Sequence, residues 1–64
     1  MLEIGDKVKL KYDLKSGRKY GDLVLDKNNI FSGEQAVIWK NNRGLVQLSN
    51  SNYYTEEMLI FVRR

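Results

Sequence analysis

The first clear pattern in the chain is a strict alternation of apolar and charged residues over residues 7–12. One face of this segment carries Val8, Leu10 and Tyr12, and the other carries Lys7, Lys9 and Lys11. A period of two is typical of a β-strand with one buried face. We therefore expect a strand whose apolar face turns inward. Its lysine face discourages pairing with another sheet edge, and it is also a candidate phosphate-contacting stripe.

The alternation stops at Asp13, and residues 13–20 are expected to leave the strand as a long excursion. Ser16-Gly17 and Gly21-Asp22 are turn signals. We expect Leu14 and Tyr20 to pack back onto the core. The basic side chains of the excursion are expected in water: Lys15, Arg18 and Lys19.

The next segment gives a weaker pattern. Residues 23–25 form an apolar run that fits either a strand or the start of a helical turn. Asp26 is a candidate cap for a single turn, and the Asn pair after Lys27 is an alternative loop. Ile30 or Phe31 is expected to plug one end of the fold.

A hairpin is predicted from residues 34–40 and 45–49, joined by a tight Asn-Asn-Arg-Gly connection at 41–44. The pairing pattern turns Ala36, Ile38, Val46 and Leu48 inward, and it turns Val37, Trp39, Leu45 and Gln47 outward. The opposite register stays open, because both faces carry apolar residues.

The stretch 52–62 is expected to fold as strand, one helical turn and strand. Of Tyr53 and Tyr54, one faces inward and one outward by the period-two rule. Thr55 is a good N-cap, and the two glutamates after it occupy the first turn, where the helix dipole favours negative charge. The closing core contacts are assigned to Met58, Leu59, Phe61 and Val62.

These elements predict one all-β domain that spans residues 1–64, with no repeat, linker or proline. The expected architecture is a small five-stranded SH3-like barrel with one short helical (3-10) turn near the C-terminus. A chain of 64 residues buries only about 60% of the surface that its unfolded form exposes, so its core is thin.

The composition restricts the chemistry, because the chain has no Cys and no His. Disulfides and zinc sites built from Cys and His are therefore excluded. The usual general base near neutral pH is also missing, as is every Ser-His or Cys-His nucleophile. A carboxylate- or lysine-based enzyme would need a concave, desolvated site, for which so small a barrel has little volume. We expect no enzyme activity, no metal and no cofactor.

Net charge is +3, from 11 basic and 8 acidic residues. This balance permits an acidic or nucleic-acid partner without requiring one. No apolar run approaches the roughly 18 residues of a membrane span, and the N-terminus lacks the pattern of a signal peptide. We expect a cytoplasmic protein with no membrane partner.

The chain resembles a family of small SH3-like proteins encoded by phages and prophages of Gram-positive bacteria. The resemblance covers nearly the whole chain through Ile4-Gly5-Asp6-x-Val8-x-Leu10, the excursion from Leu14 to Tyr20-Gly21, a Gly33-led strand with Ala36 and Ile38, and Thr55-Glu56-Glu57-Met58-Leu59. It implies a fold and a setting, the cytoplasm of an infected bacterium, but no reaction. The family tail often carries Trp where this chain has Tyr53-Tyr54, so a Trp-centred site does not transfer directly.

A weaker resemblance is to the proline-binding SH3 domains of signalling proteins. It rests on Tyr12-Asp13, Trp39 and Ser51-Asn52-Tyr53, which appear in the same order as the aromatics of their groove. The acidic excursion that contacts Arg in those ligands is absent here, where the loop is basic.

Three functions fit these features. The first is a non-catalytic binding module, a phage accessory protein that docks a host or phage protein through an aromatic surface. The second is nucleic-acid binding by the Lys-rich first strand and loop. The third is an oligomeric sponge for a nucleotide-like signal, although the sequence does not set the oligomeric state. The candidate binding residues are Trp39, Tyr53, Tyr54, Tyr20, Lys9, Lys11, Arg18 and Lys19.

Overall fold

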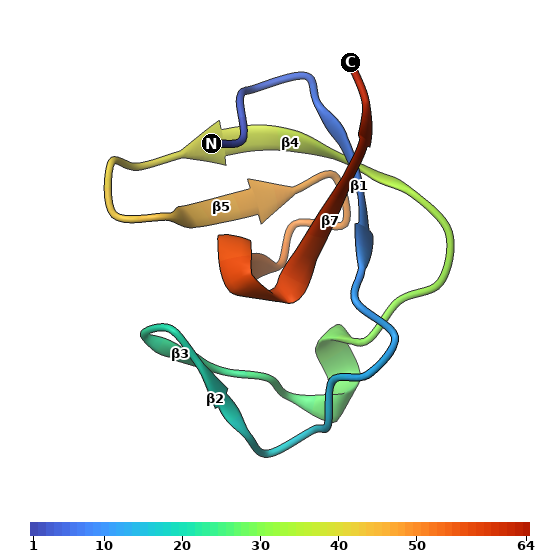
Figure 1. Cartoon of the computed structure of the whole chain (residues 1–64), viewed down its shortest axis with the longest axis vertical. Coiled ribbons are helices and arrows are strands. Elements are labelled where there is room, and N and C mark those ends of the chain that lie inside the picture. The colour runs from blue at the N-terminus through green and yellow to red at the C-terminus, as the bar shows by residue number, and fades with distance from the viewer.

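Seven short β-strands and two 3-10 turns make up the computed structural model, which describes residues 1–64 (Figure 1). In chain order the elements are β1 (Lys7–Leu10), β2 (Lys19–Tyr20), β3 (Leu23–Val24), η1 (Lys27–Asn29), β4 (Gln35–Lys40), β5 (Leu45–Leu48), β6 (Tyr53–Thr55), η2 (Glu56–Met58) and β7 (Leu59–Arg63). The predicted all-β class and the 3-10 turn near the C-terminus are confirmed.

Five strands form one antiparallel sheet in the order β6-β5-β4-β1-β7, and β2 pairs only with β3. The prediction of a closed five-stranded barrel is therefore wrong in two respects. The whole segment between β1 and β4, residues 11–34, is called the excursion from here on; it adds two strands of its own, which form a hairpin at the opposite end of the molecule from the C-terminus (Figure 1). The sheet also stays open, because η2 separates the two edge strands β6 and β7, which do not pair.

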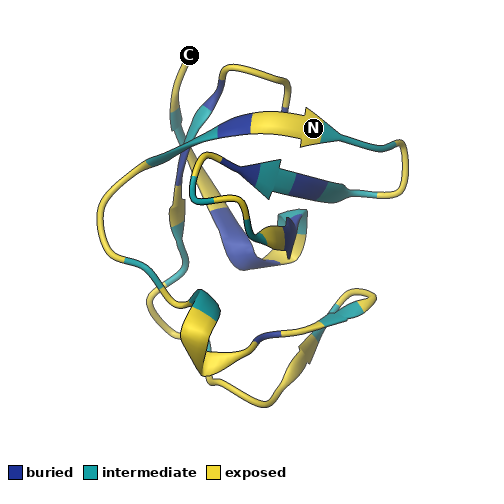
Figure 2. Ribbon diagram, turned by 180° about the vertical axis from the view of Figure 1, so that it is seen from behind, coloured by how far each residue is buried: buried dark blue, intermediate teal, exposed yellow.

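The core is a single cluster, to which the strands of the sheet, the N-terminal segment, η2 and the excursion contribute; Figure 2 colours the buried residues dark blue. It contains Leu2, Val8, Leu25, Val37, Val46, Leu48, Tyr54, Met58 and Leu59. Only 11 of the 64 residues are buried, as expected for a domain of this size, so each core side chain matters more than in a larger protein. Val46 and Leu48 face inward as predicted.

The predicted inward face of β4 is wrong at two positions. Val37 is buried, whereas Ile38 is 47% exposed. The cause is a bulge: Val37 pairs with Leu48 and Trp39 pairs with Gln47, so Ile38 is an extra residue between them. A bulge leaves one residue unpaired and interrupts the period-two alternation, which allows Ile38 and Trp39 both to face solvent.

β1 is shorter than the alternation indicated. Val8 is buried, Leu10 is half-buried and Lys9 is exposed, as predicted. The strand ends at Leu10, however, and Tyr12, which was expected inward, is 94% exposed. A period-two rule holds only while the backbone stays extended, and the chain has already turned at Tyr12.

The C-terminal stretch agrees with prediction in part. Tyr54 is buried and Tyr53 is exposed, so one tyrosine does face each way. Thr55 makes no capping hydrogen bond; its Oγ1 instead donates to the Tyr20 carbonyl at 2.8 Å. Phe61, expected in the core, is 49% exposed: it pairs with the buried Val8 but lines an open hollow beside the N-terminal segment.

The excursion packs as expected. Leu14 and Tyr20 are half-buried against the core, and so is Phe31. Asp26 caps η1: its Oδ1 accepts a hydrogen bond from the Asn28 backbone N–H at 2.9 Å. Ile30, the alternative plug, is 50% exposed.

Candidate functional site

Two exposed aromatic side chains, Trp39 and Tyr53, form an edge-to-face pair. Their ring centroids lie 5.9 Å apart at an interplanar angle of 80°. Trp39 is 41% exposed and Tyr53 is 44% exposed. Such a pair adds about 0.5–1.5 kcal/mol beyond simple burial, so the two rings hold one another in place.

Strand register places the two rings in one row. Trp39 of β4 pairs with Gln47 of β5, and Gln47 pairs with Tyr53 of β6. Side chains directly opposite one another lie on the same face of a sheet. The bulge adds the exposed Ile38 to this face. We call the set Ile38, Trp39, Gln47 and Tyr53 the aromatic face.

The other two tyrosines of the predicted site have structural roles. Tyr54 is fully buried, its ring packs against Phe31, and its hydroxyl donates to the Asn29 carbonyl at 2.5 Å. The same hydroxyl accepts a hydrogen bond from Asn50 Nδ2 at 3.0 Å. Tyr20 is half-buried, and its hydroxyl accepts a hydrogen bond from the Lys15 backbone N–H. Tyr54 therefore leaves no surface for a partner, and Tyr20 leaves little.

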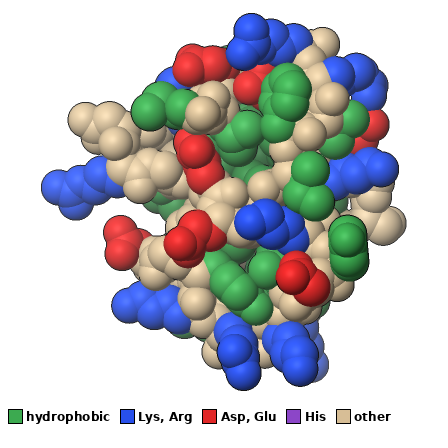
Figure 3. Space-filling view, viewed as in Figure 1, with side chains coloured by type: hydrophobic (Ala, Val, Ile, Leu, Met, Phe, Trp, Pro, Cys, Tyr) green, Lys and Arg blue, Asp and Glu red, His purple; other side chains and the backbone are tan.

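The four basic residues of the predicted site fall into two groups. Lys9 and Lys11 line one groove at the end of β1, whereas Arg18 and Lys19 lie in the excursion, Lys19 on β2. All four lack an ion pair; the three ion pairs of the chain are Lys40–Glu3, Arg63–Glu34 and Arg64–Asp6. On the face shown in Figure 3, basic side chains lie at separate places and do not form one patch.

The groove beside Lys9 and Lys11 has a volume of about 310 Å³. Leu10, Leu14 and Phe31 line it and also pack against the core. The exposed Tyr12 and Ile30 line it as well. Sequence reasoning missed this site, because it assigned Tyr12 and one of the two residues Ile30 and Phe31 to the interior. The sequence carries no signal for this site, because the alternation continues through Tyr12 whereas the strand ends at Leu10.

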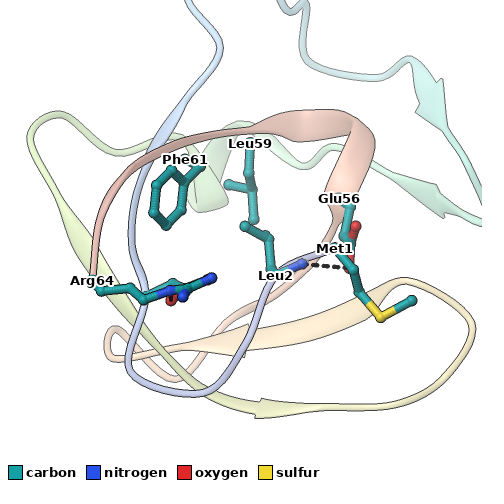
Figure 4. Close-up of a pocket in the computed structure, with 7 residues that line it drawn as sticks. Met1, Leu2, Glu56, Leu59, Phe61 and Arg64 are labelled. Carbon is teal, nitrogen blue, oxygen red and sulfur yellow. Dashed lines mark hydrogen bonds and ion pairs between the residues drawn. The ribbon is translucent and has the colours of Figure 1, made fainter.

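A second hollow, of about 360 Å³, lies between the N-terminal segment, η2 and β7 (Figure 4). Leu59 and Phe61 line it, and the Leu2 backbone N–H donates to Glu56 Oε2 at 3.3 Å. At the other end Arg64 Nε lies 3.5 Å from Oδ1 of the buried Asp6. Its polar groups are thus already engaged within the chain, and they hold the N-terminal segment across the open end of the sheet.

The acidic residues do not gather into a metal-binding cluster: no group of three or more His, Cys, Asp or Glu side chains is placed to hold an ion. The structure contains no helix of the length and apolar character needed to cross a membrane. Comparisons with protein-family models, with curated proteins and with solved structures found no match for this chain.

Proposed function

We propose that the chain is a non-catalytic binding module that docks a protein partner through the aromatic face. The observation that carries this proposal is the Trp39–Tyr53 pair, whose rings pack edge to face and yet are 41% and 44% exposed. Aromatic residues are enriched among the few side chains that supply most of the energy of a protein interface.

The geometry of the face favours a protein over a small molecule. Trp39 and Tyr53 line none of the main hollows of the surface, so their exposed rings do not form a pocket for a small molecule. The row spans three hydrogen-bonded strands, which fixes its backbone before any partner arrives. Rings that are already held in place lose little conformational entropy on binding.

The resemblance noted from the sequence supplies the expected setting. We infer a partner of phage or host origin and a fold related to SH3-like proteins. The strand order β6-β5-β4-β1-β7 and the 3-10 turn between the last two strands support that relationship. An experimental structure would test this relationship. If β2 or β3 paired with a strand of the main sheet, the strand order that supports the relationship would be wrong.

The docking proposal is tested with the double variant Trp39→Ala/Tyr53→Ala as bait in lysate of infected host cells. Wild-type protein is expected to retain a partner that the variant loses. Val24→Ala is the matched control, because it removes an apolar side chain that is 54% exposed on β3, outside both the aromatic face and the groove beside Lys9 and Lys11. The captured partner is then purified and added to the wild-type chain.

Trp39 is the only tryptophan, so its fluorescence reports on this face alone. The purified partner is expected to shift its emission to shorter wavelength and to protect it from acrylamide. An unchanged emission at saturating partner contradicts docking through the aromatic face. So does an unfolded Trp39→Ala protein, because the ring would then be part of the fold and not of a site.

A further inference from the structure

The groove at the end of β1 is a second site, which shares no residue with the aromatic face. Leu10, Leu14 and Phe31 are partly buried and pack against the core, which gives the groove an apolar lining. Tyr12 and Ile30 remain 94% and 50% exposed beside them. Exposed apolar side chains of this size next to a hollow mark a binding site more often than scattered exposure does.

Charge defines the kind of ligand. Lys9 and Lys11 line the groove, neither forms an ion pair, and no acidic residue lines it. On the neighbouring strand β7, the residue paired with Lys9 is Ile60, which is 39% exposed and carries no charge. An uncompensated pair of cations beside an apolar lining complements a ligand that is both anionic and apolar.

The lining distinguishes between two anionic ligands. Single-stranded nucleic acid needs a track of cations and several aromatic rings on which successive bases stack. Here Tyr12 is the only fully exposed ring, and only two lysines flank it. A groove of about 310 Å³ that is lined by aliphatic side chains and by only two aromatic ones instead fits one bulky apolar side chain of a peptide.

We propose that this groove binds an extended acidic segment of a protein. One apolar side chain of the segment lies against Tyr12 and Ile30, and its flanking carboxylates contact Lys9 and Lys11. The site is independent of the aromatic face, so a partner engages one, the other or both. Linked engagement of both sites raises the apparent affinity without a new contact.

The test is a titration of ¹⁵N-labelled protein with acetylated, amidated peptides, followed by amide chemical shifts. The peptide Glu-Glu-Phe-Glu-Glu is expected to shift the amides of residues 9–12 and 30–33. Glu-Glu-Gly-Glu-Glu, which lacks the apolar side chain, and Lys-Lys-Phe-Lys-Lys, which reverses the charge, are expected to leave them in place. Added salt is expected to weaken the first titration.

Two variants locate the contacts. Lys9→Gln/Lys11→Gln is expected to raise the dissociation constant of the acidic peptide about fivefold, the scale for two solvent-exposed ion pairs. Lys15→Gln/Lys19→Gln removes the same charge from exposed positions outside the groove and is expected to change it little. Tyr12→Ala removes an exposed ring without loss of core packing, and it is expected to weaken binding by a similar factor.

Three results overturn the proposal. The first is an acidic Phe peptide that leaves residues 9–12 and 30–33 unshifted. The second is a Gly peptide that shifts them equally, because charge alone would then explain the effect. The third is a ten-nucleotide oligothymidylate that shifts the same amides at lower concentration than the peptide, which would assign the groove to nucleic acid. None of these outcomes depends on whether Trp39 and Tyr53 dock a partner.

Discussion

The five-stranded sheet and the excursion of residues 11–34 are stabilised in different ways. The strands of the sheet are linked by hydrogen-bonded ladders, and eight of the nine core residues lie outside the excursion. The excursion contributes a single fully buried side chain, Leu25, and its hairpin β2–β3 pairs with no other strand.

Two hydrogen bonds from β6 fasten the excursion to the sheet. Thr55 Oγ1 donates to the Tyr20 carbonyl, and the Tyr54 hydroxyl donates to the Asn29 carbonyl. Segments with few buried apolar contacts open at lower free energy than the core. We therefore expect the excursion to open locally while the sheet stays folded. The groove beside Lys9 and Lys11 lies where these two regions meet.

The largest effect is expected from the sheet. Leu48→Ala removes a fully buried side chain from β5 and should cost about 2–5 kcal/mol of unfolding free energy. A domain of this size often has only about 3–5 kcal/mol in total, so most of the cooperative thermal transition should be lost. Circular dichroism on heating checks this. A variant that melts like wild type would contradict the view that burial of Leu48 in the sheet stabilises the domain.

An intermediate effect is expected where the hairpin contacts the sheet. Gly21 has φ +66°, and a Cβ there would lie 3.2 Å from Thr55 Cγ2. Gly21→Ala therefore combines backbone strain of about 1–2 kcal/mol with a displaced hairpin. Gly17→Ala is the matched control: its φ is +84°, but a Cβ there meets no atom within 4 Å.

Hydrogen exchange separates these two glycine variants. Gly21→Ala should speed exchange in the hairpin more than Gly17→Ala does, and neither should affect β4 and β5 strongly. Equal effects of the two variants would mean that strain alone matters and that the hairpin does not dock through Gly21.

The smallest effect is expected from the hydroxyl that joins the two regions. Tyr54→Phe keeps the buried ring and removes the hydrogen bonds to Asn29 and Asn50, at a cost of about 1 kcal/mol. Exchange should increase around η1 first. Tyr12→Phe is the control, since that side chain is 94% exposed and forms no hydrogen bond. If chemical denaturation shows the same midpoint for Tyr54→Phe and wild type, the hydroxyl does not fasten the excursion.

The features of the fold that could be predicted are those that depend on residues close together in the chain. In β1 and β5 the alternation is unbroken, and Val8, Val46 and Leu48 are buried as predicted. Local side-chain chemistry also sufficed for the Asp26 cap of η1. These features depend on residues near one another in the chain, which a pattern can report.

Features that depend on distant segments could not be predicted. The bulge at Ile38 arises from the pairing of β4 with β5, and both registers looked equally apolar in the sequence. Thr55 has the chemistry of an N-cap, but its hydroxyl reaches Tyr20, 35 residues earlier in the chain. The sheet stays open because its two edges never meet, which no local pattern encodes.

Of the two candidate sites, one could be predicted from the sequence and the other could not. The expectation that one of Tyr53 and Tyr54 faces outward near Trp39 follows from the period of two, and the structure places Tyr53 there. The groove at Tyr12 was missed, because its residues come from two segments that are joined only in three dimensions.

The bulge in β4 also determines where the strand can lose one residue without a change in the faces of the sheet. Ile38 has no partner on β5, whereas Val37 and Trp39 on either side of it do. Removing the extra residue would leave those two pairings, and the faces they define, as they are. Deletion of residue 38 should therefore leave the direction of the Trp39 side chain unchanged. Deletion of one residue elsewhere in β4 would instead turn every side chain beyond it to the opposite face of the sheet.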